Sequence, residues 1–516
     1  MIEDFIDFIG VKDVDFIEGH NINRFDNVYL LDRFSCLRNR GVKPLHDHLR
    51  DYPIMGRLLK AGRYNPVSKI RIKTFNSNQK GSHEKYKLFL PGRIILDSYD
   101  IMKDQHNESS YKLDSLAEKY LGTKKIDQDY NHIYRMWHTQ KGRHDLAVYC
   151  VKDSWLVRKM MDKLCKLTVF LQMSNVTGIS MKDVIERGQG IRTIGLMLRY
   201  AKERKPCEYL IPRLVKEQKM VTKTKFNFHT NAMETFEVEA EPASFEGAIV
   251  VPPTTGFYKD AVSCLDFASL YPSIMRALNM SYETLVSAET VTAMGWKELE
   301  GKLEAVGVRT IPDFSYNNMQ LTTVMNRKNP IFVSATTRKG LLPEMLESVL
   351  HERKMVKKQM KKILDKTSTG YKVLDGRQLG LKVVANSMYG FTGATTGFLP
   401  EKRIAASVTK YGRYMITQTK SKVENHPVWG KKHGCRCIYG DTDSVFVHMP
   451  RSLVDGTTEE ELMKNAHKMG EEMADYITDI FLPPNELEYE KSYSSFLLLR
   501  KKRYAGHKFE PGHNPK

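Results

Sequence analysis

The chain has 516 residues, of which 80 are Lys or Arg and 61 are Asp or Glu, so its formal net charge is +19. With 41% hydrophobic residues it can bury a sizeable core, and its length predicts three or four domains of about 150 residues each. The positive surplus favours nucleic acid over a membrane surface as partner, since no strong basic amphipathic anchor is present. The alternative is a soluble protein that is merely basic, and charge alone does not exclude it.

The cysteines and the apolar segments exclude several other classes. The seven cysteines are odd in number and scattered without a CxxC pair, which argues against a disulfide framework and against structural zinc. No apolar run approaches eighteen residues and no leader opens the chain, so we expect a soluble, intracellular protein without membrane contact. Linker-like composition is confined to residues 76–83 and 511–516.

The opening segment predicts a helix, a strand from Val14 to Ile17, and then a strand-to-helix junction that carries Asn21 and Asp26. Asn and Asp at such a junction can join a metal or phosphate site, although plain helix caps are more common. Further on, Tyr149 and Asp153 are four residues apart and share one face if that segment is helical. A phenol and a carboxylate could then converge on one water or phosphate. Each of these two signals is weak alone.

The next stretch predicts two helices and a charged loop. One helix is expected from Trp155 to Met173, and a second runs through Arg187 towards Arg199. The segment from Lys202 to Glu241 alternates basic and acidic runs, and we interpret it as a solvated surface loop.

A buried strand is expected up to Asp266, followed by a helix that Pro272 opens, where its missing N–H has no cost. A carboxylate at a strand end, next to backbone N–H groups at a helix start, suits a metal–triphosphate complex. Tyr271 could lie flat under a sugar and leave no room for a 2′-hydroxyl. The alternative makes Asp266 a strand cap and Tyr271 a core aromatic.

Two helices with polar stripes follow. After Pro343, helical spacing lines up Arg353, Lys357 and Lys361, and their mutual repulsion would be relieved by a polyphosphate. A merely solvated basic face is the alternative. The second helix predicts one polar face and ends in two glycines; the face carries Gln378, Lys382, Asn386 and Tyr389, and the glycines are Gly390 and Gly393. Facing each other, the two helices would form a triphosphate clamp.

The segment from Tyr439 to Ser444 predicts a Gly-Asp turn between two short strands. It would hold Asp441 and Asp443 at the lip of a sheet, where carboxylate oxygens suit Mg²⁺. Taken alone, a Gly-Asp-x-Asp turn is more often only a solvated hairpin.

Together these segments resemble the family B DNA polymerases. Their motif sequences are most similar to those of the delta-type replicative branch and its relatives in large DNA viruses. The resemblance covers nearly the whole chain in family order, which makes a chance match negligible. Its three polymerase motifs are residues 266–273, 378–390 and 439–444, followed by matches at 487–491 and 501–504. The second and third motifs of the family's 3′–5′ exonuclease are similar to the segments that carry Asn21 with Asp26 and Tyr149 with Asp153.

The resemblance implies a DNA-directed DNA polymerase that adds deoxynucleotides to a primer 3′-hydroxyl with two Mg²⁺ ions, or Mn²⁺ in their place. Asp266 and Asp443 would be the catalytic metal ligands, and Asp441 a supporting carboxylate. The implied nucleotide-binding residues are Ser269, Leu270, Tyr271, Arg353, Lys357, Lys382 and Asn386. The implied DNA-binding residues are Phe245 (Tyr in the family), Gly247, Tyr389, Gly390, Thr442, Lys501, Lys502 and Tyr504.

The implied fold is a multidomain chain of α/β and α+β type. It comprises a partial ribonuclease-H-like exonuclease domain (1–165), a connector (166–244), and a right-hand palm (245–339 and 393–516) split around helical fingers (340–392). The family continues into a thumb, whereas this chain stops at Lys516, so we expect both ends to be truncated.

The family's first exonuclease motif, Asp-x-Glu, does not occur before Asp26. Because two-metal chemistry needs enough carboxylates for both ions, we expect little or no exonuclease activity from this chain. The alternatives to a polymerase core are a DNA-binding fragment that requires a missing thumb or a partner chain, and a 3′–5′ exonuclease. The expected partners are primer–template DNA, deoxynucleoside triphosphates, and a processivity factor or complementary polymerase chain.

Overall fold

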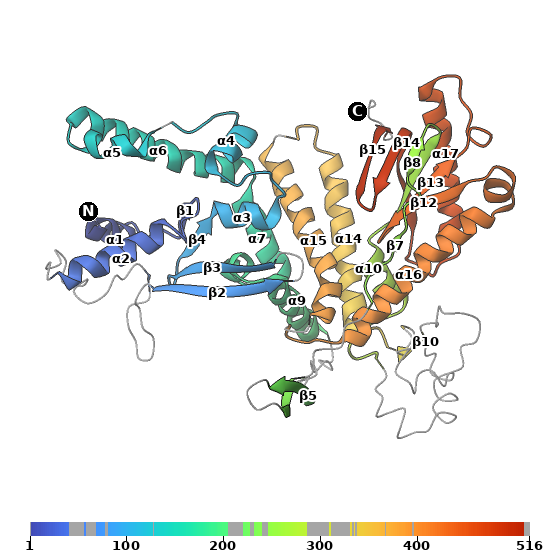
Figure 1. Ribbon diagram of the computed structural model, residues 1–516, viewed down its shortest axis with the longest axis horizontal. Helices are drawn as coiled ribbons and strands as arrows, with labels where there is room; N and C mark the ends of the chain where they lie inside the picture. Colours follow the sequence, from blue (N-terminus) through green and yellow to red (C-terminus); the bar gives the residue numbers. More distant parts are fainter. Residues whose placement is uncertain are drawn as a thin grey trace. The chain divides into compact units, whose positions relative to one another are not determined.

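The computed structural model describes residues 2–40, 56–57, 69–77, 81–126, 128–204, 220–227, 232–239, 246–285, 309–310, 331–332, 335, 338–366, 368–394 and 397–509. The chain divides into two compact units, Met1–Leu171 and Gln172–Lys516. Their helices and strands are drawn in Figure 1. Within the described residues, no helix combines the length and apolar character needed to cross a membrane.

The first unit is built on a parallel strand pair. β1 (Phe16–Gly19) pairs with β4 (Ile94–Asp97), so the strand expected at Val14–Ile17 begins two residues later than predicted. The other elements are α1 (Ile2–Val11), α2 (Asp26–Asn39), α3 (Ser98–Gln105), α4 (Leu113–Leu121) and the antiparallel hairpin of β2 (Lys69–Ser77) and β3 (Gly81–Phe89). Ile6, Ile9, Phe34, Leu88, Leu90 and Ile95 form its apolar core.

Three further helices follow in this region: α5 (Tyr130–Trp137), α6 (Gln140–Lys163) and α7 (Lys166–Thr177). The single helix expected from Trp155 to Met173 is therefore wrong, because the chain breaks between α6 and α7. Cys165 takes a left-handed conformation there, with φ of 49°. Apolar residues continue across the break, so the sequence period gave no sign of it.

The second unit contains a curled, seven-stranded antiparallel sheet. Its order is β15-β14-β9-β13-β12-β7, and β8 also pairs with β14. Along β14, the register with β15 and with β9 shifts at several points, and such bulges bend a strand. The strands are β7 (Val250–Val251), β8 (Gly256–Tyr258), β9 (Ala261–Phe267), β12 (Arg436–Asp441), β13 (Ser444–Met449), β14 (Leu487–Arg500) and β15 (Arg503–Phe509).

α16 and α17 pack on this sheet, and the other helices of the unit pack on one another. α14 and α15 stand side by side in Figure 1, and α10 packs against both of them and against α16. α17 packs on β14 and β9. The helices are α8 (Met181–Glu186), α9 (Gln189–Glu203), α10 (Leu270–Ala277), α14 (Leu341–Lys361), α15 (Thr369–Gly393), α16 (Lys402–Asn425), the π-helical turn η2 (Pro427–Lys432) and α17 (Glu459–Thr478).

One large apolar cluster joins these helices to the sheet. Its fully buried members include Leu265 of β9, Ile274 of α10, Leu342 of α14, Val384 of α15 and Val445 of β13. Because a single packed core spans all five elements, a change in side-chain volume in one of them shifts the packing of the others.

The surface loop expected from Lys202 to Glu241 is wrong in part. β5 (Met220–Asn227) and β6 (Ala232–Glu239) form an antiparallel hairpin there, while residues 205–219, 228–231 and 240–241 lie outside the described residues. The charge runs of this segment favour a loop, whereas its β-branched residues Val221, Thr222 and Thr224 favour a strand. A further two-stranded pair is formed by β10 (Arg309–Thr310) and β11 (Ile331–Phe332).

Candidate active site

The end of the curled sheet brings two carboxylates onto neighbouring backbone positions. Asp266 of β9 lies opposite Ser444, which Asp443 immediately precedes. The N–H of Phe267 donates to the carbonyl oxygen of Asp443 at 2.9 Å, and the N–H of Asp443 donates to that of Asp441 at 2.7 Å. The hairpin predicted at residues 439–444 is confirmed, but its turn is Thr442-Asp443 and not Gly440-Asp441, which still belong to β12. These bonds fix the turn against the end of β9.

Both carboxyl groups are half-buried and resist ionisation. Burial, together with the nearby Asp443 and Glu490, raises the pKa of Asp266 to about 7. Burial also raises the pKa of Asp443, to which Asp441 and Glu490 contribute. Carboxylates that repel one another in a partly desolvated site are stabilised by a bound cation.

A third strand adds acidic residues that the sequence analysis gave no role. Glu488 of β14 lies opposite Asp266 in register. Glu490 acts electrostatically on both Asp266 and Asp443, and its carboxylate pairs with the Nζ of Lys491 at 3.0 Å. The acidic residues of the matched segment 487–491 were the available signal, although their place beside Asp266 depends on the pairing of β14 with β9.

Asp441 differs from the other two aspartates because it already has partners. The Tyr439 hydroxyl donates to its Oδ2 at 3.2 Å, and the Nζ of Lys502 pairs with the same oxygen at 3.1 Å. The backbone N–H of Lys502 in turn donates to the Tyr439 hydroxyl at 2.9 Å. The carboxylate therefore links the turn of β12 and β13 to the turn of β14 and β15.

The chain leaves β9 through a strained residue and enters α10 earlier than predicted. Ser269 has φ of 51° and stands before a helix that begins at Leu270, so the expected start at Pro272 is wrong by two residues. The N–H of Ala268 donates to the Glu486 carbonyl oxygen at 2.9 Å, which ties this exit to the residue before β14. The side chain of Leu270 is buried in the core, which leaves its backbone for any contact with a ligand.

Tyr271 of α10 and Tyr389 of α15 lie against each other. Their ring centroids are 4.4 Å apart and their planes are inclined by 41°. Burial raises the pKa of Tyr271 to about 12, with contributions from Tyr389 and Asp443, so its phenol stays neutral. Two residues distant in the sequence thus form one aromatic wall close to Asp443.

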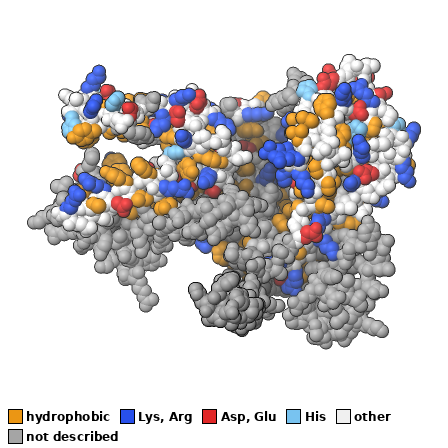
Figure 2. Space-filling view, viewed as in Figure 1, with side chains coloured by type: hydrophobic (Ala, Val, Ile, Leu, Met, Phe, Trp, Pro, Cys, Tyr) orange, Lys and Arg blue, Asp and Glu red, His pale blue; other side chains and the backbone are white. Residues whose placement is uncertain are grey.

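Lys357 of α14 lies close enough to Arg353, on the same helix, and to Lys382 of α15 to be repelled by both. Burial lowers the pKa of Arg353 and of Lys357, and for Lys357 the charges of Arg353 and Lys382 lower it further. Lys382 and Asn386 are exposed on α15, whereas Val384 and Met388 are buried, which confirms the predicted two-faced helix. Figure 2 shows a group of Lys and Arg side chains near the middle of this face, between the places where Figure 1 labels α14 and β15.

The predicted DNA-contacting residues lie on several elements. Lys501 and Lys502 lie in the exposed turn before β15, and the ring of Tyr504 packs 5.1 Å from that of Phe446. The Thr442 N–H donates to the Ile249 carbonyl oxygen at 3.2 Å. The carbonyl oxygen of Gly247 accepts a 2.6 Å hydrogen bond from Arg413. Gly390 is exposed in α15, and Phe245 lies outside the described residues.

In the first unit, the exonuclease-like residues lie between β1 and the start of α2, and on α6. Asn21 follows β1 with φ of 61°, and its N–H donates to Asp97 Oδ1 at 2.8 Å, whereas Asp26 begins α2. Tyr149 and Asp153 share one face of α6, as predicted, and Lys125 bonds both, at 3.2 Å and 2.8 Å respectively. Among the described residues, Asn21 Oδ1 and Asp153 Oδ1 are buried oxygens without a hydrogen-bond partner.

No group of three or more His, Cys, Asp or Glu side chains converges tightly enough to hold a metal by itself in the described part of the chain. The Asp266–Asp443 pair consists of two hard oxygen donors with raised pKa values. Mg²⁺ suits such a pair, because it is commonly held by one or two carboxylates, with waters and substrate phosphates completing its shell.

Comparison with known proteins gives matches over nearly the whole chain. Residues 179–516 match the family model "DNA polymerase family B", and residues 1–116 match "DNA polymerase family B, exonuclease domain". The DNA polymerase delta catalytic subunit of Oryza sativa subsp. japonica is 37% identical over 97% of this chain and 39% of its own length. The corresponding proteins of Schizosaccharomyces pombe (35%) and Drosophila melanogaster (34%) match over 98% of this chain and 40% of theirs.

Proposed function

The chain belongs to DNA polymerase family B, and we propose that it forms the catalytic core of a DNA-directed DNA polymerase. The chain spans about 40% of the length of the curated relatives it matches, which are eukaryotic delta catalytic subunits. The observation that carries the proposal is the pair of half-buried carboxylates, Asp266 and Asp443, fixed on adjacent strands. The reaction would transfer a deoxynucleoside monophosphate to a primer 3′-hydroxyl, with pyrophosphate leaving.

Asp266 and Asp443 would hold the divalent cations, Mg²⁺ or Mn²⁺. Such ions would lower the pKa of the primer hydroxyl and neutralise charge on the triphosphate. Asp441 would act indirectly, because its carboxylate is already bonded to Tyr439 and Lys502. It would thereby hold the turn that carries Asp443.

The remaining residues would bind and orient the incoming nucleotide. Arg353, Lys357 and Lys382 would pair with the triphosphate, which would relieve the mutual repulsion of these cations. The wall formed by Tyr271 and Tyr389 would lie under the sugar and exclude a 2′-hydroxyl. Asn386 would border the nucleotide, and the backbone of residues 269–271 would meet phosphate oxygens.

In this proposal, residues 245–339 and 393–516 form the palm and residues 340–392 the fingers. Residues 1–165 form the exonuclease-like domain, and 166–244 the connector. The DNA-binding residues would be Lys501, Lys502, Tyr504, Tyr389 and the backbone near Gly247, Gly390 and Thr442. They would contact the shape and backbone of the duplex and not particular bases, because the template sequence is read by base pairing.

Template dependence tests this proposal. Each of the four deoxynucleoside triphosphates is supplied singly to the purified chain with a labelled primer–template and Mg²⁺. Only the nucleotide complementary to the next template base is expected to extend the primer, and the preference should follow when that base is changed. Addition that ignored the template base would contradict the proposal.

Metal binding is expected to depend on pH through Asp266. Its carboxyl group is largely protonated below its pKa of about 7, so a cation must displace a proton there. Mn²⁺ affinity should therefore fall as pH drops from 8 to 6, approaching about tenfold per unit well below 7, and level off above pH 8. Calorimetry in two buffers of different ionisation heat would count the protons released. An affinity that did not change between pH 6 and 8 would contradict the assignment.

Gly390 offers a test that separates stability from function. A Cβ added there would meet nothing within 4 Å, so Gly390→Ala should stabilise α15 by about 0.5–1 kcal/mol. If DNA or nucleotide approaches this backbone, the same methyl group should reduce kcat/KM for extension by about tenfold or more. Gly370→Ala, at an equally open position in the first turn of α15, should leave extension unchanged. Equal activity of the two variants would remove Gly390 from the proposed contact surface.

A further inference from the structure

The start of α14 is capped by a segment far from it in sequence. The residue before the helix, Gly340, supplies no side-chain cap, although a helix start leaves four N–H groups without partners. Three side chains that follow α10 accept hydrogen bonds from three consecutive N–H groups. The N–H of Gly340 donates to Asn279 Oδ1 at 2.8 Å, that of Leu341 to Glu283 Oε1, and that of Leu342 to Ser281 Oγ at 3.2 Å.

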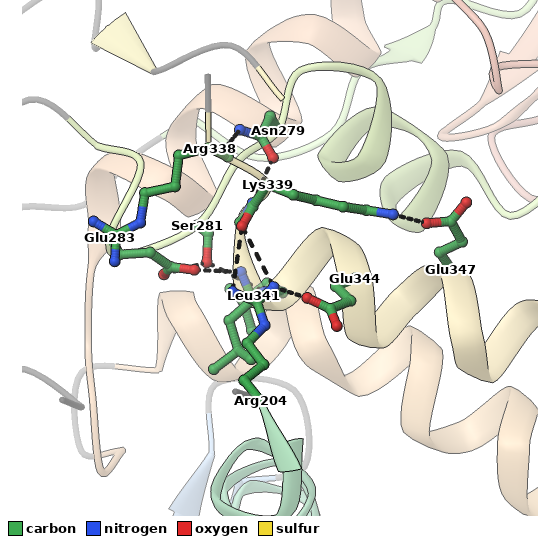
Figure 3. Close-up of polar contacts among 11 residues, drawn as sticks. Arg204, Asn279, Ser281, Glu283, Arg338, Lys339, Leu341, Glu344 and Glu347 are labelled. Atoms are coloured by element: carbon green, nitrogen blue, oxygen red, sulfur yellow. Dashed lines mark hydrogen bonds and ion pairs between the residues drawn. The ribbon is translucent and has the colours of Figure 1, made fainter. Parts of the chain in front are cut away.

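Figure 3 shows Asn279, Ser281 and Glu283 at the start of α14; the first two are buried, whereas Glu283 is half-buried. Asn279 is 2% exposed and Ser281 is fully buried. The amide of Asn279 also donates to the Arg338 carbonyl oxygen at 2.8 Å, and the Ser281 hydroxyl donates to Glu283 Oε2 at 2.7 Å. A Cβ on Gly340 would lie 2.8 Å from the Cβ of Ser281, so the close approach requires glycine there.

A second set of contacts lies around this cap. Arg204, which ends α9, forms an ion pair with Glu344 and donates to the Lys339 carbonyl oxygen at 3.4 Å. Lys339 pairs with Glu347 on the next turn of α14. These pairs are partly exposed, where ion pairs stabilise little. The hydrogen bonds to buried Asn279 and Ser281 and to half-buried Glu283 therefore carry most of the fixation of the helix start.

The cap connects the two halves of the proposed active site. α10 starts next to Asp266, and its far end leads into the capping segment. α14 carries Arg353 and Lys357, and Lys357 lies sixteen residues beyond Leu341. At about 1.5 Å per residue that separation is about 24 Å, so a tilt of about 5° at the helix start would move Lys357 by about 2 Å.

We propose that Asn279, Ser281 and Glu283 are positioning residues for nucleotide binding, which fix the base of α14 and thereby hold its cations in place opposite the carboxylate pair. This inference rests on the proposed function. In this role the three residues do not contact nucleotide or metal themselves. Glu283 adds a negative charge at the positive end of the helix dipole, which strengthens the cap.

The test compares Glu283→Ala, which removes an acceptor, with Glu283→Gln, which keeps one for the Leu341 N–H. Thr458→Ala is the control, because it removes an ordinary cap from α17, where the Thr458 hydroxyl accepts from the Glu461 N–H at 3.2 Å. Two readouts are taken well below the melting temperature. One is amide hydrogen exchange of residues 340–342, and the other is the Kd of the next correct deoxynucleotide on a dideoxy-terminated primer–template.

Glu283→Ala is expected to accelerate exchange at 340–342 and to raise the nucleotide Kd by about five- to tenfold, with DNA affinity unchanged. Glu283→Gln and Thr458→Ala should stay within about twofold of the unmodified chain for the nucleotide Kd. A Glu283→Ala variant that bound nucleotide as tightly as the control would overturn the positioning role alone. An unmodified chain that bound no nucleotide would overturn the proposed function, and the positioning role with it.

Discussion

Replacing Asp443 with Ala is expected to reduce the single-turnover rate of primer extension by about 10⁴-fold, equivalent to about 5.4 kcal/mol of transition-state stabilisation. The reason is geometric. Asp443 and Asp266 are the pair fixed on adjacent strands, and removal of one leaves the cations a single carboxylate of that pair. Primer–template affinity should change less than about twofold, because the loss falls on chemistry and not on phosphate contacts. Rapid-quench kinetics and fluorescence anisotropy measure the two quantities.

Asp441→Asn is the matched comparison in the same turn. Its amide oxygen can still accept from the Tyr439 hydroxyl, while the ion pair with Lys502 is lost. We expect a loss of only about tenfold, because Asp441 supports the turn without binding the cations. Comparable losses for Asp441→Asn and Asp443→Ala would show that the proposed division of roles is wrong. Extension by Asp443→Ala at the unmodified rate would remove Asp443 from the metal site.

The second large effect is expected at Lys382. Lys382→Ala should reduce kcat/KM for the incoming nucleotide by about 10²- to 10³-fold, or about 3–4 kcal/mol. Lys382 is exposed on the polar face of α15 and lies close enough to Lys357 to lower its pKa. Its removal would leave the triphosphate with fewer cations in the transition state, where charge develops. Pre-steady-state incorporation over a range of nucleotide concentrations would separate binding from rate.

Lys372→Ala provides the control on the same helix. Lys372 lies ten residues nearer the start of α15, about 15 Å along the helix axis. Its loss reduces the net charge by the same amount but should leave nucleotide kinetics within about twofold of the unmodified chain. Equal effects of the two variants would mean that α15 contributes only general positive charge, and the clamp would have to be abandoned.

The sequence predicted the main elements of the second unit because its signals were periodic and local. The strand ending near Asp266, the hairpin at residues 439–444 and the two-faced α15 all appear. Boundaries were less predictable where backbone geometry decided them. Left-handed backbone conformations at Ser269 and Cys165 set the start of α10 and the end of α6. Serine and cysteine rarely adopt this conformation, so the residue types did not predict it.

The candidate site was predictable in its residue types but not in its pairings. Asp266 and Asp443 stood out because each follows a β-forming run, yet only the sheet order brings them onto adjacent strands. The influence of Glu490 on both aspartates was missed, since it depends on the third strand, β14. The bonds between Lys125 and the α6 pair, Tyr149 and Asp153, likewise depend on tertiary packing that no local pattern encodes.

Primer extension by the purified chain tests the central claim most directly. The reaction contains a labelled primer–template, all four deoxynucleotides and Mg²⁺ at low salt, where phosphate contacts hold DNA most strongly. DNA binding is measured in parallel. We predict extension that stops when EDTA removes the metal and that Asp266→Ala abolishes. DNA binding without any extension, under conditions where the chain is folded, would contradict the account and leave a DNA-binding protein without catalytic activity.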